Sequence, residues 1–152
     1  MPRQKDAQKP GACFCVNVRR AARAITKIYD QALEPSGLKV TQYSMLKNID
    51  AYGPLNTSAL AKLLSLDRTT LVRNLKLLES AGLIENRTSP DPRERQFIIT
   101  EHGRQTVAHA MPFWKHTQRR LSQQIGTDNL ALIGHLASVL EGLATGQDEP
   151  IA

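Results

Sequence analysis

Apolar residues return at steps of three and four along most of the chain, which is the spacing of amphipathic helices. In the N-terminal part this pattern predicts a helix from Cys13 to Leu33 and a second helix that Thr41 caps. Tyr52-Gly53-Pro54 ends the second helix, because glycine and proline interrupt helical structure. The apolar stripe of this helix consists of Tyr43, at its edge, and Met45, Leu46 and Ile49.

Two shorter helices are predicted next, each with a side-chain cap at its N-terminus. Asn56 caps the first and Asp67 the second, and Ala81-Gly82 stops the second at its C-terminus. The residues expected to face inward are Leu60, Leu63 and Leu64 in the first helix and Leu71, Leu75 and Leu78 in the second.

A β-hairpin is expected after these helices. Leu83–Arg87 and Gln96–Thr100 have the composition of short strands, and the polar stretch between them contains Pro90 and Pro92. Such a stretch is typical of a projecting hairpin tip.

The last third of the chain is predicted to form two helices. The first opens with Thr100 and runs to about Gln124, with a disturbance expected at Pro112, and Thr127-Asp128 caps the second. The apolar stripe of the second helix consists of Ile133, Leu136, Leu140 and Leu143. Its heptad-like steps suit burial against another helix, either within the subunit or in a partner.

Composition excludes several classes of protein. The 152 residues are 41% hydrophobic, which argues against general disorder, although residues 1–11 are expected to be a disordered arm. Apolar runs are too short for a transmembrane helix, and no apolar segment precedes Cys13 as a secretory signal would require. We therefore expect a cytoplasmic protein that does not associate with membranes.

The net charge of +6 is unevenly distributed and favours an anionic partner. Residues 1–36 carry +4, residues 37–100 carry +3 and residues 101–152 carry −1. The basic excess therefore lies in the first two-thirds of the chain, which contains the short central helices and the hairpin.

The helix after Asp67 has a solvent face suited to nucleic acid. Two helices joined by a three-residue turn have helix-turn-helix geometry, in which the second helix enters the major groove of DNA. Arg68, Thr69 and Thr70 occupy its first turn, where free N–H groups favour phosphate. The face opposite the leucine stripe consists of Thr69, Arg73, Lys76 and Ser80, all hydrogen-bond donors and none acidic. An ordinary solvated helix face is the alternative interpretation.

The hairpin tip carries Arg93 and Arg95, and an arginine on a narrow projection can enter the minor groove. Asp91 is placed to hold Arg93 extended through a bidentate pair. A charged surface turn is the alternative. Helix face and tip together predict a winged helix.

In these motifs the chain resembles the MarR family of winged-helix transcriptional regulators. The likeness covers roughly residues 13–145, and Ile99 stands where the family usually has leucine. The segments that carry the resemblance are 37–46, 67–75, 78–84, 91–95 and 99–103.

The resemblance implies a mainly α protein with a small β-hairpin wing (α+β). Residues 37–100 would form a winged helix-turn-helix DNA-binding lobe, and residues 12–36 and 101–147 a helical dimerisation region. It further implies a homodimeric repressor that recognises a pseudo-palindromic operator in double-stranded DNA and is released by a small aromatic or lipophilic ligand. By this likeness Arg68 to Asn74 read the major groove and Arg93 reaches the minor groove; Lys76 and Arg95 are added as DNA contacts by their positions.

Two further groups of residues are candidates for control by oxidation or ligand. Cys13 and Cys15 could sense oxidation, although residues two apart in a helix point about 200° from each other and need an irregular N-terminus or another subunit to form a disulfide. Burial as small apolar residues is the alternative. The residues that could line a ligand pocket are Tyr43, Met111 and Trp114, for each of which core packing is the alternative.

No enzyme, cofactor or metal site is expected. The chain has no P-loop, G-x-G-x-x-G, G-x-S-x-G or H-E-x-x-H motif. His102, His109 and His116 are one heptad apart, and a rise of about 10.5 Å between neighbours is too long for two of them to share a metal ion within one subunit. Partly exposed histidines are expected, and an intersubunit site or a pH-sensitive face is the alternative. A thiol-based redox regulator and a winged helix that binds protein rather than DNA remain the alternative functions.

Overall fold

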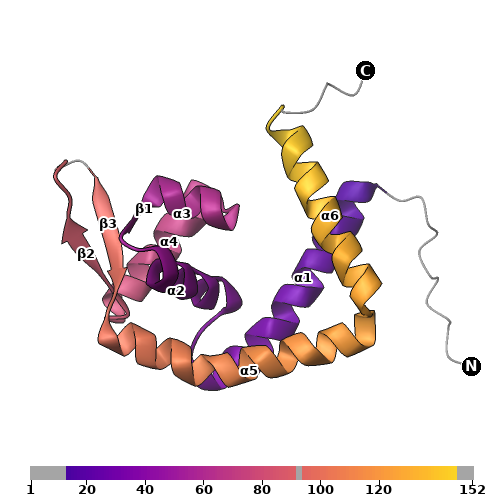
Figure 1. Cartoon of the computed structure of the whole chain (residues 1–152), viewed down its shortest axis with the longest axis horizontal. Helices are drawn as coiled ribbons and strands as arrows, with labels where there is room; N and C mark the ends of the chain where they lie inside the picture. Colours follow the sequence, from indigo (N-terminus) through magenta and orange to yellow (C-terminus); the bar gives the residue numbers. More distant parts are fainter. Residues whose placement is uncertain (1–12, 92–93, 147–152) are drawn as a thin grey trace, which may run out of the picture. The chain divides into compact units, whose positions relative to one another are not determined.

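The computed structural model describes residues 13–91 and 94–146, which are mainly helical with one small antiparallel sheet (Figure 1). The predicted fold class is therefore confirmed, while the predicted arm at residues 1–11 lies outside the described residues. The elements in chain order are α1 (Phe14–Leu33), the 3-10 helix η1 (Glu34–Ser36), α2 (Val40–Tyr52), β1 (Leu55–Asn56), α3 (Thr57–Leu64), α4 (Arg68–Ser80), β2 (Ile84–Thr88), β3 (Arg95–Ile99), α5 (Glu101–Ile125) and α6 (Thr127–Ala144). They form two compact units, divided after Trp114 within α5.

The start of α2 differs from the prediction. Lys39 is the N-cap residue, and its backbone N–H donates to Gln42 Oε1 at 2.9 Å. The next N–H, that of Val40, donates to Asp30 Oδ1 in α1 at 2.8 Å. Thr41 therefore lies inside the helix, and its predicted role as N-cap is wrong because Gln42 and Asp30 already satisfy these donors.

Both central caps are confirmed. Asn56 Oδ1 accepts from Ala59 N at 2.7 Å, and Asp67 Oδ1 accepts from Thr70 N at 2.8 Å. A side-chain acceptor at this position satisfies an N–H group that has no partner within the helix. The sequence therefore located the N-termini of α3 and α4 correctly.

The inward face of α3 is narrower than predicted. Leu60 is fully buried and Leu64 packs against the core, but Leu63 is 48% exposed, so its predicted inward position is wrong. The reason is geometric: Leu63 lies about 100° around the helix from Leu64, beyond the strip of this short helix that faces the core.

The sheet contains one strand that the sequence pattern did not predict. Its order is β1-β3-β2, all antiparallel, and β1 pairs Leu55 with Phe97 and Asn56 with Gln96. A two-residue strand is too short to show the alternation by which strands are recognised. The predicted hairpin strands are present, each shifted by one residue. Because β1 leads directly into α3, the sheet places Asn56 beside the first residues of β3.

The core of the first unit gathers the stripes predicted for α2 and α4. Tyr43, which was expected at the edge of its stripe, is as deeply buried as the rest. The buried apolar residues that form this core include Leu33, Tyr43, Met45, Leu46, Ile49, Leu60, Leu71, Leu75, Leu78, Ile84, Phe97 and Ile99.

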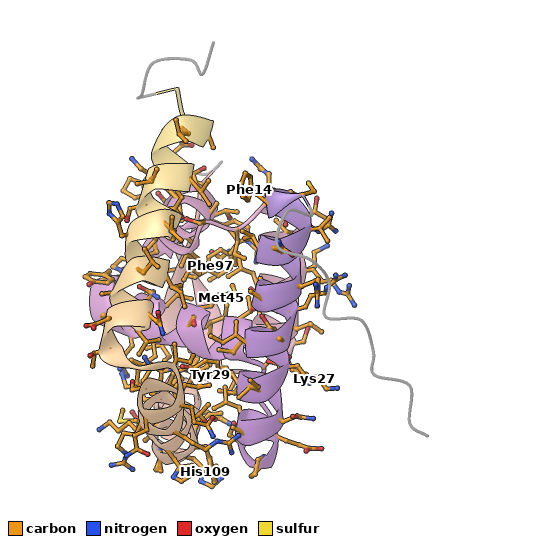
Figure 2. All side chains as sticks on the ribbon, turned by 90° about the vertical axis from the view of Figure 1, so that its right-hand side faces the viewer. Phe14, Lys27, Tyr29, Met45, Phe97 and His109 are labelled. Atoms are coloured by element: carbon orange, nitrogen blue, oxygen red, sulfur yellow. The ribbon has the colours of Figure 1, made fainter. Side chains whose placement is uncertain are left out.

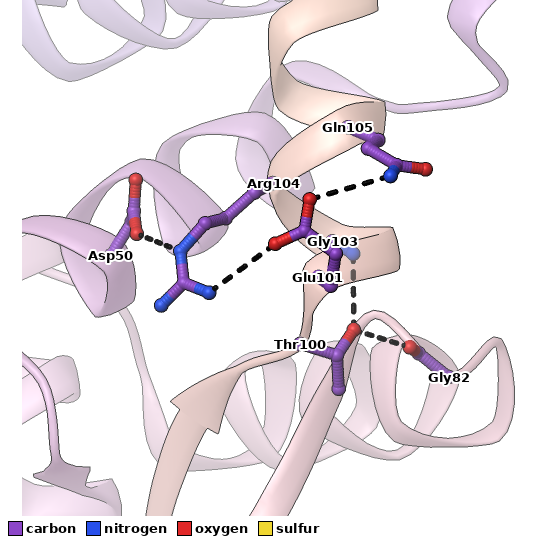
Figure 3. Close-up of polar contacts among 7 residues, drawn as sticks. All are labelled: Asp50, Gly82, Thr100, Glu101, Gly103, Arg104 and Gln105. Atoms are coloured by element: carbon purple, nitrogen blue, oxygen red, sulfur yellow. Dashed lines mark hydrogen bonds and ion pairs between the residues drawn. The ribbon is translucent and has the colours of Figure 1, made fainter.

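The beginning of α5 is joined closely to the preceding elements (Figure 3). Thr100 Oγ1 donates to the carbonyl of Gly82 at 2.6 Å and accepts from Gly103 N at 3.0 Å. Arg104 Nε donates to Asp50 Oδ1 of α2 at 3.0 Å. Gly103 permits this approach, because a Cβ there would lie 2.1 Å from the carbonyl oxygen of Leu83. These contacts define where α5 leaves the sheet.

The second unit contains the end of α5 and α6. Pro112, in the preceding part of α5, does not interrupt that helix. Gly126, with φ of 83°, is the N-cap residue of α6, so the predicted cap at Thr127-Asp128 is wrong. Glycine adopts this positive φ without strain, and α6 therefore begins directly after it. No helix in residues 13–91 and 94–146 is long and apolar enough to span a membrane.

Candidate nucleic-acid interface

The α4 helix presents the predicted basic face to solvent. Its leucine stripe is buried, while Thr69, Arg73, Lys76 and Ser80 on the opposite side are exposed. An open groove of about 660 Å³ runs along this face. The residues that line it are Arg68, Thr69, Val72, Arg73, Lys76, Leu77 and Ser80, none of which is acidic. The face can therefore donate hydrogen bonds to an anionic or acceptor-rich ligand without carboxylate repulsion.

Two of the predicted DNA-binding residues on α4, Thr70 and Asn74, already use their polar side chains in hydrogen bonds to the helix and its cap. Thr70 donates its hydroxyl to Asp67 Oδ2 at 2.6 Å, and Asn74 Nδ2 donates to the carbonyl of Thr70 at 2.9 Å. The Thr70 hydroxyl, followed by the Thr70 N–H, holds the pKa of Asp67 below its ordinary value. Arg68 and Thr69 are exposed beside this cap. The structure thus separates side chains open to a ligand from those that form the helix terminus.

Arg95 lies at the base of the hairpin and contacts α4. Its Nη2 donates to both carboxylate oxygens of Glu79, at 2.8 and 3.0 Å, and its guanidinium lies 5.4 Å from the ring centre of Phe97. From the sequence Arg95 is expected at the hairpin tip, and Glu79 is not a predicted site residue. No local signal pairs them, because they are 16 residues apart and meet only when β3 packs beside α4.

Glu94 makes a corresponding contact with the other helix of the pair. Asn56 Nδ2 donates to Glu94 Oε1, while Asn56 Oδ1 caps α3. The sequence predicted the cap but not the second contact, which depends on the pairing of β1 with β3. Consecutive residues of the hairpin thus bond to the start of α3 and to α4.

The tip of the hairpin is described only in part. The predicted minor-groove residue, Arg93, lies outside the described residues, so its pairing with Asp91 stays a prediction. On either side of it, Glu94 N donates to the carbonyl of Asp91 at 3.0 Å, and Asp91 N donates to Ser89 Oγ at 3.3 Å. These bonds bring the two ends of the tip together.

Of the candidate ligand-pocket residues, Tyr43 and Trp114 are part of the packing of the first unit. Tyr43 stacks on Trp114, with ring centres 5.9 Å apart and planes inclined by 29°. Burial raises the pKa of the Tyr43 phenol above its ordinary value. Met111 is half-buried. A contact between these residues and a ligand remains a prediction.

The N-terminal helix carries a second open groove, of about 750 Å³. Lys27 lines it and points outward from α1 (Figure 2). Arg23 and Lys39 add further basic groups, while Asp30 and Glu34 add carboxylates. The mixed signs distinguish this groove from the acid-free face of α4.

The cysteines are free, exposed thiols at the start of α1. Cys13 precedes the helix with non-helical φ and ψ of −33° and 123°, whereas Cys15 lies in its first turn. Cys13 therefore supplies the irregular helix start that a disulfide between the two cysteines requires, whereas Cys15 is helical. Farther along the chain, His109 packs edge-on against Phe113, and the described residues contain no cluster of three or more metal-ligating side chains.

Comparison with known proteins gives consistent matches. Residues 38–93 match the MarR family model. Two uncharacterized HTH-type transcriptional regulators of Bacillus subtilis (strain 168) are similar in sequence. YwoH is 30% identical over 86 residues, which cover 57% of this chain and 63% of YwoH. YhbI is 31% identical over 124 residues, which cover 81% of this chain and 80% of YhbI.

Solved structures extend the similarity to nearly the whole fold. The Mycobacterium tuberculosis transcriptional regulator MosR, in complex with DNA, has a TM-score of 0.72 and 34% identity, covering 84% of this chain and 98% of that one. The transcriptional repressor CouR bound to a 23-mer DNA duplex has a TM-score of 0.74 and 29% identity, covering 84% and 92%. CouR bound to p-coumaroyl-CoA has a TM-score of 0.75 and 28% identity, covering 88% and 97%.

Proposed function

Because this chain belongs to the MarR family of transcriptional regulators, we propose that it is a homodimeric repressor that binds a pseudo-palindromic operator and is released by a small-molecule ligand. The resemblance carried by its sequence motifs is thereby confirmed, and the family is one of regulators rather than enzymes. We place its action in the cytoplasm. The single observation that carries the DNA-binding proposal is the exposed, acid-free face of α4.

The chemistry of that face suits the major groove of DNA. Arg73 can bond the O6 and N7 atoms of guanine together, and Thr69 can bond a base or contact a thymine methyl group. Arg68 and the N–H groups of the first turn suit backbone phosphate. Relatives of 34% and 29% identity, MosR and CouR, have been solved with DNA.

Exposed apolar residues on α1 and α6 support the homodimer. No residue of α6 is buried, and Ile133, Leu136 and Leu140 are each about half exposed. Phe14 in α1 is 88% exposed. Apolar surface of this kind is typical of an interface, and a two-fold dimer would present two α4 helices to half-sites about one helical turn apart.

The oligomeric state can be tested on α6. Leu136→Asp with Leu140→Asp should shift the protein from dimer to monomer in light scattering at micromolar concentration, because two buried charges oppose association. Ser138→Asp is the matched control, since Ser138 lies on the opposite side of the helix from that stripe. A dimer that survives the double substitution would exclude α6 as the interface.

Release by a ligand is proposed from the aromatic side chains and from a relative. CouR, 28% identical, has been solved with p-coumaroyl-CoA, an aromatic thioester. Met111 and Trp114 are partly exposed, and Tyr43 is stacked beneath Trp114. Their thioether and aromatic groups are of the kind that binds small aromatic or lipophilic molecules. A panel of such compounds should include one that raises the melting temperature and releases the protein from DNA.

Operator binding is the decisive experiment. A binding sequence selected from genomic fragments, beginning with DNA upstream of its own gene, should form a salt-sensitive complex in fluorescence anisotropy. Arg73→Ala should weaken it by about 5- to 150-fold, as expected for loss of a bidentate base contact. Arg93→Ala should weaken it several-fold and reduce the salt slope by about one.

Arg120→Ala, which removes an exposed cation outside the DNA-binding lobe, is the matched control and should leave the affinity nearly unchanged. The absence of any sequence-selective complex would favour the winged helix as a protein-interaction module.

A second candidate for the release signal is oxidation of Cys13 and Cys15. Exposed thiols near each other, one of them outside the regular helix, are accessible to peroxide and to a second thiol. Peroxide should then release the parent from DNA, and Cys13→Ser with Cys15→Ser should abolish this response. DNA binding by the parent that is insensitive to peroxide would exclude the thiol mechanism.

A further inference from the structure

Glu94, which directly precedes β3, and Arg95, its first residue, bond to the two helices of the helix-turn-helix. Glu94 accepts a hydrogen bond from Asn56, the cap of α3, and Arg95 donates to Glu79 on α4. The two bonds reach different elements, the N-cap residue of α3 and a residue of α4. Together they restrict rotation of the hairpin base about the axis of β3.

The side chain of Arg95 is held along its length as well as at its end. Its guanidinium lies over the ring of Phe97, which is buried and pairs with Leu55 across the sheet. Arg95 also pairs with Thr88 of β2 in the backbone register. The ion pair with Glu79 therefore connects α4 to a strand that the core already anchors.

The position of Glu79 argues against Arg95 as a direct DNA ligand. The Glu79 carboxylate lines a small cavity of about 220 Å³ together with Lys76 and Arg95. An acid here would oppose a nearby phosphate, and it already engages the arginine through both oxygens. The position of the Glu79 carboxylate beside the DNA-binding face is therefore better explained by its ion pair with Arg95, which it holds in place.

We propose that Glu79 and Arg95 are positioning residues that set the direction of the hairpin wing relative to the recognition helix α4. The proposal rests on the DNA-binding function proposed above. The hydrogen bond between Asn56 and Glu94 likewise sets the direction of the wing relative to α3. Glu94 also donates its N–H to the carbonyl of Asp91 at 3.0 Å, so a change in the direction of the strand base moves Asp91 with it.

Substitution of Glu79 distinguishes a positioning role from direct contact between Arg95 and DNA, because the two roles predict opposite changes in operator affinity. If Glu79 positions the wing, Glu79→Ala weakens operator binding about five-fold or more, a loss typical of coupled contacts. If Glu79 only competes with DNA for Arg95, the same substitution strengthens binding. Glu85→Gln, which removes one exposed carboxylate from β2, is the matched control and should change affinity less than two-fold.

The salt dependence of Arg95→Met gives a second readout. Methionine keeps an apolar stem over Phe97 but removes the charge. A positioning role predicts weaker binding with an unchanged salt slope, whereas loss of a phosphate contact reduces the slope by about 0.9. The double variant, Arg95→Met with Glu79→Ala, should bind operator no more weakly than the weaker of the two single variants. Additive losses of binding free energy would overturn the coupling.

Hydrogen exchange without DNA distinguishes failure of this proposal from failure of the proposed function. Glu79→Ala should speed amide exchange at the start of β3 while leaving α2 unchanged. If the parent binds no operator, the regulatory function fails, yet the exchange result still decides whether the ion pair holds the wing. Unchanged exchange at β3 would overturn the positioning role.

Discussion

The Asp30 carboxylate in α1 accepts the backbone N–H of Val40, the first residue of α2, at 2.8 Å. An N-cap acceptor supplied by another helix satisfies a donor in the first turn and also connects the two helices. Asp30→Ala should therefore lower the free energy of unfolding by about 1 kcal/mol. Urea denaturation at fixed protein concentration measures this change.

Two variants control for other effects at this site. Asp30→Asn keeps an oxygen acceptor and should lose less stability than alanine. Glu34→Ala removes an exposed carboxylate from the same groove and should alter stability by less than about 0.5 kcal/mol. Equal stability of Asp30→Ala and the parent would show that the bond contributes nothing.

Gly103 is required by a close approach and not by its backbone angles. In Gly103→Ala the new Cβ would lie 2.1 Å from the carbonyl oxygen of Leu83 and 2.7 Å from Ile99 Cγ1. Because backbone must move to relieve the first contact, we expect a loss of about 1–3 kcal/mol in the free energy of unfolding.

Substitution of a glycine in α6 is expected to have the opposite effect on stability. A Cβ at Gly134 would meet no atom within 4 Å. Gly134→Ala should therefore stabilise the chain by up to about 1 kcal/mol through helix propensity alone. Thermal unfolding of both variants compares them, and equal effects would contradict the steric account.

Asp67 should contribute to the pH dependence of stability. Hydrogen bonds from the Thr70 hydroxyl and then the Thr70 N–H lower its pKa from the ordinary 3.8 in the folded state. A lowered folded pKa stabilises the fold above the unfolded pKa, and this contribution is lost as the pH falls through the folded pKa. The stability difference between the parent and Asp67→Asn should therefore shrink below about pH 4.

The cause of that shift can be checked separately. Thr70→Val removes the hydroxyl donor but keeps the N–H, so the pKa of Asp67 should rise toward 3.8 in an NMR titration. A pKa that stays equally low would assign the shift to the backbone alone.

The two faces of α3 should respond differently to truncation. Leu60→Ala removes a fully buried side chain and should lower the free energy of unfolding by about 2–5 kcal/mol. Leu63→Ala removes a half-exposed one and should change it by much less, about 0.5 kcal/mol or below. Similar losses of unfolding free energy for the two variants in chemical denaturation would contradict the exposed position of Leu63 and favour the predicted inward one.

The recognition helix illustrates how much could be read in advance. Its cap at Asp67, its leucine stripe and its stop at Gly82 lie within one short segment, and the structure contains all three. Helical periodicity and capping act over a few residues, so they are visible in the sequence. Local capping signals do not predict the starts of α2 and α6. A more distant acceptor, Asp30, lies at the first, and a glycine with positive φ, Gly126, precedes the second.

The wing base illustrates the opposite case. Arg95 was assigned to the tip because of its neighbours in sequence, but its carboxylate partner is on α4, 16 residues away. The two-residue strand β1, which brings Asn56 to Glu94, has no periodicity to detect.

The sequence by itself determined the order of the helices, the faces that α2 and α4 bury, and the acid-free surface of α4. These follow from local backbone preferences and from the angle between successive side chains. Only the tertiary structure decided which polar groups meet, such as Asp30 with Val40 and Glu79 with Arg95. Such pairs depend on how separate elements pack, and packing is a property of the whole core rather than of any one segment.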